Sequence, residues 1–142
     1  TGSGTSVTLF SDDFEDGNLD DWATTGSVSA NSNAANSGVY GARLRATAGM
    51  IITVDTTGYA KVDLKYDRTT SKFDANETLD VHWRLDGSAW NLIESTSATS
   101  WDTIERTLDI TSGQSDLQIR FKTNANRNNE YGYLDNVIIT GS

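Results

Sequence analysis

The chain has 142 residues, with 20 acidic against 11 basic side chains and a formal net charge of −9, a length that suits one ordinary domain with its own core. The acidic excess argues against general affinity for phosphate backbones, so we expect no nucleic-acid partner. There is no cysteine, which excludes a disulfide framework, a thiolate metal site and a cysteine nucleophile. No segment approaches the ~20 apolar residues that a membrane helix requires, so we also expect no membrane partner.

The first six residues, TGSGTS, are small and polar. This composition is typical of a flexible tether. We therefore expect residues 1–6 to be a linker and residues 7–142 to form a single module.

Hydrophobic side chains alternate with period two along the chain, and no segment sustains a period of 3.6, so the pattern predicts an all-β protein. Without a helix to cover a sheet face, two sheets must cover each other. The fold predicted is a two-sheet antiparallel β-sandwich with jelly-roll topology. Ten strands are expected, over residues 7–14, 28–32, 42–47, 50–55, 60–69, 78–86, 90–95, 103–110, 117–123 and 131–140.

Jelly-roll order, counted from residue 42, places the second, seventh, fourth and fifth strands in one sheet and the first, eighth, third and sixth in the other. The first of these sheets then contains residues 50–55, 117–123, 78–86 and 90–95. Alternation sorts its side chains between two faces. The core face is expected to hold Leu79, Val81, Trp83, Leu85, Leu117, Ile119 and Phe121. The outer face is expected to hold Asp80, His82, Arg84, Gln118, Arg120 and Lys122.

This outer face combines three cationic side chains and a histidine with a single acid, on a chain that is acidic as a whole. Arginine and glutamine donors can bind sugar hydroxyls, and arginine pairs with carboxylate or sulfate. We take the six residues, with Trp90 at their edge as a stacking surface, as the candidate carbohydrate-binding set. A plain solvated sheet face is the alternative, and Trp90 could equally lie in the core.

Three other aromatic residues, Trp101, Tyr131 and Tyr133, lie near strand ends and are further stacking candidates. For Trp101 a place in the core is favoured.

The two ends of the chain look like parts of one site. FSDDFEDGNLDDW at residues 10–22 and YGYLDNVIIT at residues 131–140 both place carboxylates beside apolar strand residues. A hard cation bound by oxygen ligands could tie the first strand to the last. The alternative is an acidic turn that only caps a strand.

FEDG at residues 14–17, NSGVYGARL at 36–44 and LDNV at 134–137 together resemble the jelly-roll carbohydrate-binding modules of secreted bacterial polysaccharide-degrading enzymes. The resemblance implies a noncatalytic, extracellular, monomeric module that binds a polysaccharide and is tethered to a catalytic domain. It also implies a structural calcium ion, held by Glu15, by the region of Asn36 and Ser37, and by Asp135, with Asp13 or Asp16 as additional ligands.

A second resemblance leaves another function open. DVHWRLDGSAWNLI, LQIRFKTN and YLDNVIIT also resemble the β-sandwich domains that follow the catalytic domain of secreted subtilisin-like proteases. Such a domain would stabilise its neighbour or dock a protein. The basic outer face favours an anionic polysaccharide as ligand, and a neutral glucan also stays open.

Catalysis is not expected. The single histidine, His82, lies in the middle of a predicted strand, and the sequence contains no G-x-S-x-G, H-E-x-x-H or phosphate-cradling glycine loop. Paired carboxylates could act as acid and base, but their distances cannot be read from a sequence.

Overall fold

The structure is a computed structural model that describes residues 6–85, 88–110 and 116–142. The predicted tether at residues 1–6 therefore lies outside the described residues, except for Ser6. The described elements are β1 (Val7–Asp12), β2 (Ala23–Asn31), a short 3₁₀ turn η1 (Ser32–Ala34), β3 (Gly41–Asp55), β4 (Lys61–Ser71), β5 (Leu79–Leu85), β6 (Asn91–Thr96), β7 (Asp102–Asp109), β8 (Asp116–Asn124) and β9 (Tyr131–Gly141). Within these residues no helix is long and apolar enough to cross a membrane.

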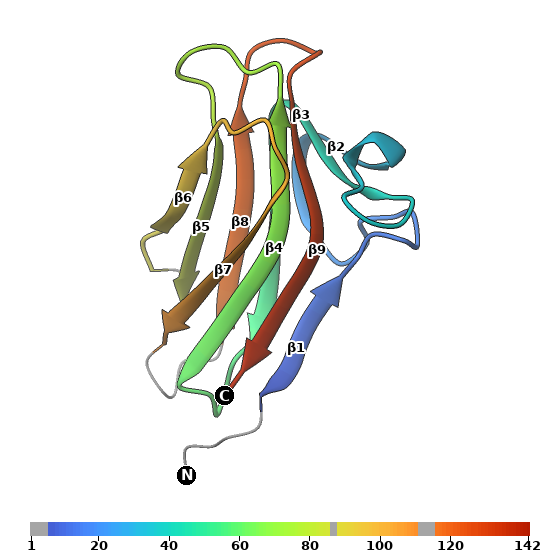
Figure 1. Cartoon of the computed structure of the whole chain (residues 1–142). Coiled ribbons are helices and arrows are strands. Elements are labelled where there is room, and N and C mark those ends of the chain that lie inside the picture. Colours follow the sequence, from blue (N-terminus) through green and yellow to red (C-terminus); the bar gives the residue numbers. More distant parts are fainter. Residues whose placement is uncertain (1–5, 86–87, 111–115) are drawn as a thin grey trace.

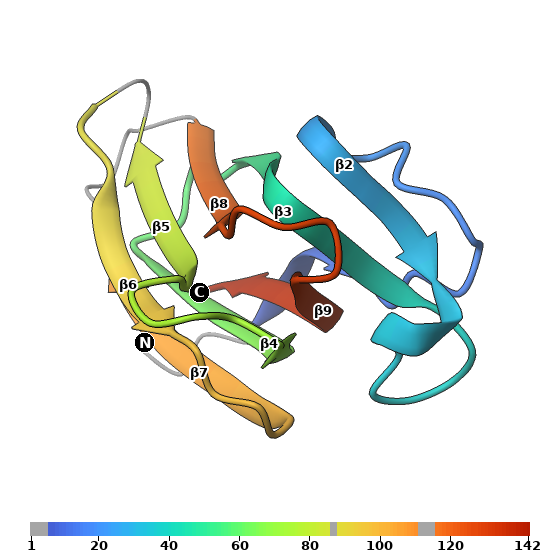
Figure 2. The same ribbon diagram turned by 90° about the horizontal axis from the view of Figure 1, so that it is seen from above.

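The strands pair antiparallel in the order β6-β5-β8-β3-β9-β4-β7, with β1 added to β9 and β2 added to β3. Figures 1 and 2 show two layers, one with β5, β6 and β8 and the other with β4, β7 and β9. We call them the β5 sheet and the β4 sheet. The predicted all-β jelly-roll sandwich is confirmed, including which strands share each sheet.

The strand β3 belongs to both sheets, so the prediction of two strands at 42–47 and 50–55 was wrong. Residues Ala42–Arg45 pair with β9 of the β4 sheet, and residues Thr47–Asp55 pair with β8 of the β5 sheet. Between these two stretches, Ala46 has a positive φ of 57°. A single left-handed residue bends the strand without ending it, and this lets one strand pass from one sheet to the other.

The core lies between the two sheets. From the β5 sheet, Leu79, Val81, Leu117, Ile119 and Phe121 are fully buried, as predicted. Trp83 and Leu85 are only partly buried and pack against the edge of the core. They follow the predicted alternation, but they lie toward the end of β5, where the opposite layer covers them less completely.

Candidate functional site

The outer face of the β5 sheet gathers the predicted carbohydrate-binding side chains. Strand β5 pairs with β8 in a register that sets His82 opposite Arg120. The same register pairs Asp80 with Lys122 and Arg84 with Gln118. We call these six residues the basic face. The structure therefore brings these six predicted side chains together on one face.

Trp90 lies on this face and not in the core. The guanidinium carbons of Arg84 and Arg120 each lie 4.2 Å from the centroid of its ring. The His82 ring approaches the same indole edge-on, with 6.4 Å between centroids. Contacts of a guanidinium with an indole contribute about 0.5–2 kcal/mol each. They fix Trp90 beside the two arginines.

The basic face carries polar atoms that the protein itself does not satisfy. His82 Nδ1 and Arg120 Nε are buried and have no hydrogen-bond partner among the described residues, and a buried unpaired polar atom is costly. By contrast, Arg84 Nε donates to Gln118 Oε1 at 2.6 Å. Asp80 is engaged by two hydroxyls, those of Ser95 and Thr78. Arg84 keeps its charge, since the Gln118 amide that it binds is neutral, so the positive charge of the face is spread over Arg84, Arg120 and Lys122.

The pKa values of His82 and Arg120 are lowered by burial first and by neighbouring positive charges second. Burial lowers the pKa of His82, and the charges of Arg120 and Lys122 lower it further. Burial and the nearby charge of Arg84 also lower the pKa of Arg120. A negatively charged ligand oxygen nearby would offset the repulsion between these positive charges and would raise the pKa of both side chains.

A groove of about 590 Å³ adjoins the basic face and shares Arg120 and Lys122 with it. Its other walls come from β2 and β3, including Thr24, Thr25 and Ile51. The sequence did not point to these residues, because the strand here was expected to begin only at residue 28. Small side chains at residues 23–26 give no alternating pattern that could have revealed the groove.

The remaining aromatic candidates lie on the opposite outer face, that of the β4 sheet. The rings of Tyr131 and Tyr133 are stacked with 5.8 Å between centroids, and Trp101 stacks on Tyr133 at 6.4 Å. The Arg43 guanidinium lies 4.8 Å from the Tyr131 centroid. The expectation that Trp101 belongs to the core was wrong, because the residue precedes β7 and its ring turns outward to Tyr133. We call Trp101, Tyr131 and Tyr133 the aromatic row.

The predicted cation ligands Glu15 and Asp135 hold the same segment of chain. Asp135 is fully buried, and its Oδ2 accepts the main-chain N–H groups of Asn36 at 2.8 Å and Ser37 at 3.1 Å. The Glu15 carboxylate accepts the N–H groups of Val39 at 2.8 Å and Tyr40 at 2.9 Å. Two carboxylates, one from each end of the chain, thus clasp residues 36–40.

Gly38 lies in the middle of this clasp. Its φ is 71°, and a Cβ at this position would lie 2.5 Å from Glu15 Oε2. Only glycine fits both the backbone conformation and the close approach of the carboxylate.

The oxygen atoms of the predicted calcium ligands do not by themselves form a coordination shell. Among the described residues, the only group of three acids or histidines with ligand atoms within 4.8 Å is Asp74, Glu77 and Glu130. Asp13 and Asp16 instead line a pocket of about 370 Å³ next to Asn136, together with Asp12 and Asp21.

A second carboxylate lies close to Asp135. Asn136 donates its main-chain N–H to Asp135 Oδ1 and its side-chain amide to Asp67 Oδ2, both at 2.9 Å. Burial raises the pKa of Asp135 and the charge of Asp67 raises it further, while the three N–H donors lower it. Calcium at this end of the sandwich stays a prediction, because the N–H donors already occupy the carboxylate oxygens.

Comparison with known proteins places the chain in a family. A family model described as a carbohydrate binding domain matches residues 6–129, while no match was found among curated proteins. The xylan-binding domain CBM22-1 of Paenibacillus barcinonensis Xyn10C superimposes with a TM-score of 0.68 at 17% identity, covering 94% of both chains. A CBM61 module solved with β-1,4-galactotriose gives a TM-score of 0.68 at 14% identity, covering 91% of this chain and 94% of the other.

A third neighbour contains a catalytic module as well. It comprises the CBM22-1 and GH10 modules of Clostridium thermocellum endo-1,4-β-D-xylanase 10B, complexed with xylohexaose. The TM-score is 0.68 at 17% identity, with 95% of this chain and 28% of that chain covered. At these identities the neighbours establish the fold, and the family model covers well over half of the chain. The chain belongs to the carbohydrate-binding domain family.

Proposed function

We propose that this module binds an anionic polysaccharide on its basic face and keeps an attached enzyme close to that substrate. Members of the family are noncatalytic, in agreement with the prediction that the chain is not an enzyme. The observation that carries the proposal is the pair of arginines, Arg84 and Arg120, against one indole ring. Beside them, a buried Arg120 Nε lacks a partner.

The chemistry of the face favours a carboxylate or sulfate over a neutral sugar. Arginine offers a planar set of donors that matches such anions. Three cations and only one acid, Asp80, lie on this face, and hydroxyls already engage Asp80. Trp90 is sheltered by the two arginines, so it is less available as a bare stacking platform for a neutral ring.

The module would act through proximity. Tethering a weak binder to a catalytic domain raises the effective concentration of the polysaccharide near the active site. One structural neighbour carries a similar module together with a GH10 module in a xylanase, which supports the tethering. We expect the module and its attached enzyme to act outside the cell.

A structural cation forms part of the proposal. The pocket beside Asn136 is lined by the predicted ligands Asp13 and Asp16 together with Asp12 and Asp21, and carboxylate oxygens in an irregular turn suit calcium. No three of these described carboxylates have oxygens within 4.8 Å of one another, so a bound ion would draw them closer together. Burial and the charges of Asp16 and Asp21 raise the pKa of Asp12. A bound calcium ion would offset this repulsion.

The alternative of a docking domain requires a partner over the basic face. All six residues of the basic face keep part of their surface exposed to solvent. An open face fits a long polysaccharide, and the family assignment favours the same conclusion.

Affinity electrophoresis in gels that contain polygalacturonate tests the proposal. We expect Arg120→Ala and Arg84→Ala each to reduce retardation, and added salt to weaken binding by the unmodified module, because exposed charge pairs are screened. Arg127→Ala, at an exposed arginine in the loop between β8 and β9, is the matched control for loss of one positive charge. Melting temperatures would check that the variants stay folded. Normal retardation of both arginine variants would refute the basic face as the binding site.

A further inference from the structure

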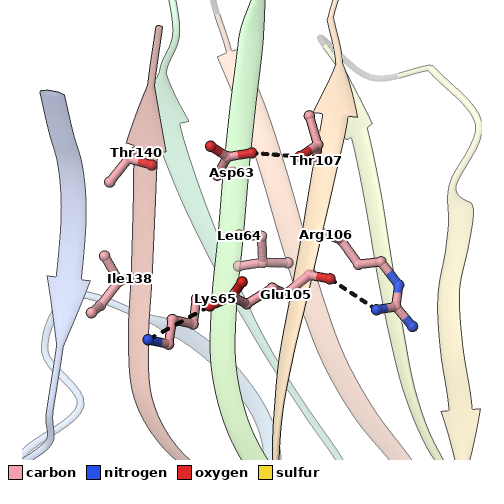
Figure 3. A pocket seen from close by; sticks show the side chains of 8 residues that line it. All are labelled: Asp63, Leu64, Lys65, Glu105, Arg106, Thr107, Ile138 and Thr140. Atoms are coloured by element: carbon pink, nitrogen blue, oxygen red, sulfur yellow. Dashed lines mark hydrogen bonds and ion pairs between the residues drawn. The ribbon is translucent and has the colours of Figure 1, made fainter. Parts of the chain in front are cut away.

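The outer surface of the β4 sheet is hollowed by a groove of about 510 Å³. Figure 3 shows its lining side chains on three neighbouring strands, β7, β4 and β9. Strand pairing arranges them in two rows across the sheet. Asp63 lies between Thr107 and Thr140, and Lys65 lies between Glu105 and Ile138. This face points away from the basic face, on the other side of the sandwich.

The groove holds more acid than base. Two acids, Asp63 and Glu105, line it with Lys65, whereas the Arg106 side chain extends away from them (Figure 3). The Lys65 to Glu105 ion pair is long, at 3.7 Å, and both side chains are at least half exposed, so it is weak and easily rearranged. The groove therefore has no excess of positive charge that would select an anion, and its ligand chemistry differs from that of the basic face.

The polar groups of the groove suit hydroxyl groups. Thr107 donates to Asp63 Oδ1 at 2.6 Å, and the hydroxyl of Thr140 lies in the same row (Figure 3). Carboxylates accept hydrogen bonds from hydroxyls, and threonine hydroxyls both donate and accept. Between them Ile138 is 37% exposed, which provides an apolar contact for the C–H face of a sugar ring.

The same face continues into the aromatic row. Along β4, Asp63 lies at the groove and Ser71 lies opposite Tyr131 at the other end, a separation of roughly 26 Å for a strand. Between them, Thr103 donates to Asp67 Oδ1 at 2.6 Å. Beside Tyr131, the buried Nε of Arg43 has no partner among the described residues. The groove and the aromatic row thus share one face, and between them Asp67 is only 7% exposed and also accepts from the amides of Asn36 and Asn136.

We propose that the outer face of β4, β7 and β9 is a second carbohydrate-binding surface, which takes a neutral polysaccharide chain. The lack of excess positive charge in the groove, its hydroxyl and carboxylate groups, and the partly exposed aromatic row fit a ligand with many hydroxyls and no ionic groups. One module could then hold an anionic chain on the basic face and a neutral chain on the opposite face, which increases retention by multivalency.

Titration of the ¹⁵N-labelled module with xylohexaose or β-1,4-galactotriose, followed by NMR, tests this inference. We expect chemical-shift changes at residues 61–71, 101–107 and 131–140, and none centred on residues 79–85 and 117–123. Tyr131→Ala should weaken binding of the neutral probe roughly fivefold, from the loss of one aromatic contact. Asp63→Ala, at the other end of the face, should also weaken it.

Arg120→Ala is the matched control, because it should leave the neutral probe unaffected while it weakens polygalacturonate binding. This pair of ligands separates the two proposals, since each can fail alone. The second surface is refuted if neither neutral probe binds at millimolar concentration, or if its shift changes centre on Arg120. It is also refuted if Asp63→Ala and Tyr131→Ala abolish self-association instead of sugar binding, because a second copy of the chain would then occupy the face. Melting temperatures of all variants would exclude unfolding as the cause.

Discussion

Asp135 on β9 accepts the main-chain N–H of Asn36, 99 residues earlier in the chain, at 2.8 Å. The same oxygen accepts the N–H of Ser37, so one fully buried carboxylate fixes the start of segment 36–40. Because buried N–H groups left without an acceptor are costly, we expect Asp135→Asn to lower the free energy of unfolding by about 3 kcal/mol. Urea denaturation measures this change. Asp20→Asn is the control, because Asp20 is exposed, and it should shift stability by less than about 0.5 kcal/mol. Equal stability of the two variants would show that the clasp contributes nothing.

Removal of calcium should lower the melting temperature. A cation bound only to the folded protein stabilises it by mass action, and the pocket lined by Asp12, Asp13, Asp16 and Asp21 is the proposed site. We expect EGTA to lower the melting temperature and added calcium to restore it. Asp13→Asn and Asp16→Asn should make the response smaller. An identical melting curve in EGTA and in calcium would contradict the proposed cation.

The sheet arrangement could be predicted from the sequence because period-two alternation marks strands, and jelly-roll order then determines their neighbours. The continuity of β3 could not. It depends on Ala46, which has a positive φ and whose carbonyl accepts the hydroxyl of Thr123 at 2.7 Å. Alanine gives no local signal for a left-handed conformation. The bend is imposed by contacts with a strand 77 residues away.

The two sheets are also joined by an ion pair in the interior. Arg68 on β4 binds both carboxylate oxygens of Glu94 on β6, at 2.9 and 3.1 Å, and Tyr66 donates to the same carboxylate at 2.9 Å. The two charged side chains are only 7% and 12% exposed. Loss of one partner from a buried pair costs about 3–5 kcal/mol, so we expect Glu94→Ala to lower the free energy of unfolding by about 3 kcal/mol.

The control for Glu94→Ala is Glu105→Ala, which removes the exposed ion pair with Lys65. That pair should contribute no more than about 1 kcal/mol. Both variants can be measured by chemical denaturation at one pH. A loss for Glu94→Ala as small as that for Glu105→Ala would mean that the interior pair gives no net stabilisation.

The basic face was predictable, whereas the surface on the other side of the sandwich was not. Alternation together with jelly-roll strand order was enough to place His82 and Arg120 on one face of neighbouring strands. The β4-sheet groove combines side chains from β4, β7 and β9, and the opposition of Asp63 and Thr107 depends on a register that alternation alone does not specify. Trp101 was misassigned because it lies just before β7, where the alternation of side chains along a strand does not yet distinguish the core from the outer face.

Stability should depend on pH through Glu130, which is 2% exposed. Its carboxyl group lies close to those of Asp74 and Glu77. Burial raises the pKa of Glu130, hydrogen bonds with the two acids raise it further, and the N–H of Arg127 lowers it. A folded-state pKa above the unfolded value means stability that is present below the unfolded pKa and lost as pH rises through the folded pKa.

Glu130→Gln should therefore melt at a higher temperature than the unmodified module at pH 8 and show no such gain at pH 4. Its amide oxygen can still accept the N–H groups of Asn126 and Arg127, and its amide nitrogen can donate to the neighbouring carboxylates. Thermal unfolding at several pH values measures the difference. A gain of equal size at both pH values would exclude ionisation of Glu130 as the cause.

Binding of an anionic glycan should become tighter as the pH falls, because His82 lies on the basic face. Burial lowers the pKa of His82 and the charges of Arg120 and Lys122 lower it further, while Asp80 opposes this. A bound anion favours the charged imidazole, so the complex has a higher His82 pKa than the free module, and binding takes up a proton.

One added charge near the surface is worth roughly 1 kcal/mol, so we expect the affinity for a sulfated polysaccharide to rise about fivefold from pH 7.5 to pH 5. Sulfate stays ionised over this range, and His82→Asn should abolish the pH dependence in isothermal titration calorimetry. If the unmodified module shows the same affinity at both pH values, His82 does not face the bound anion.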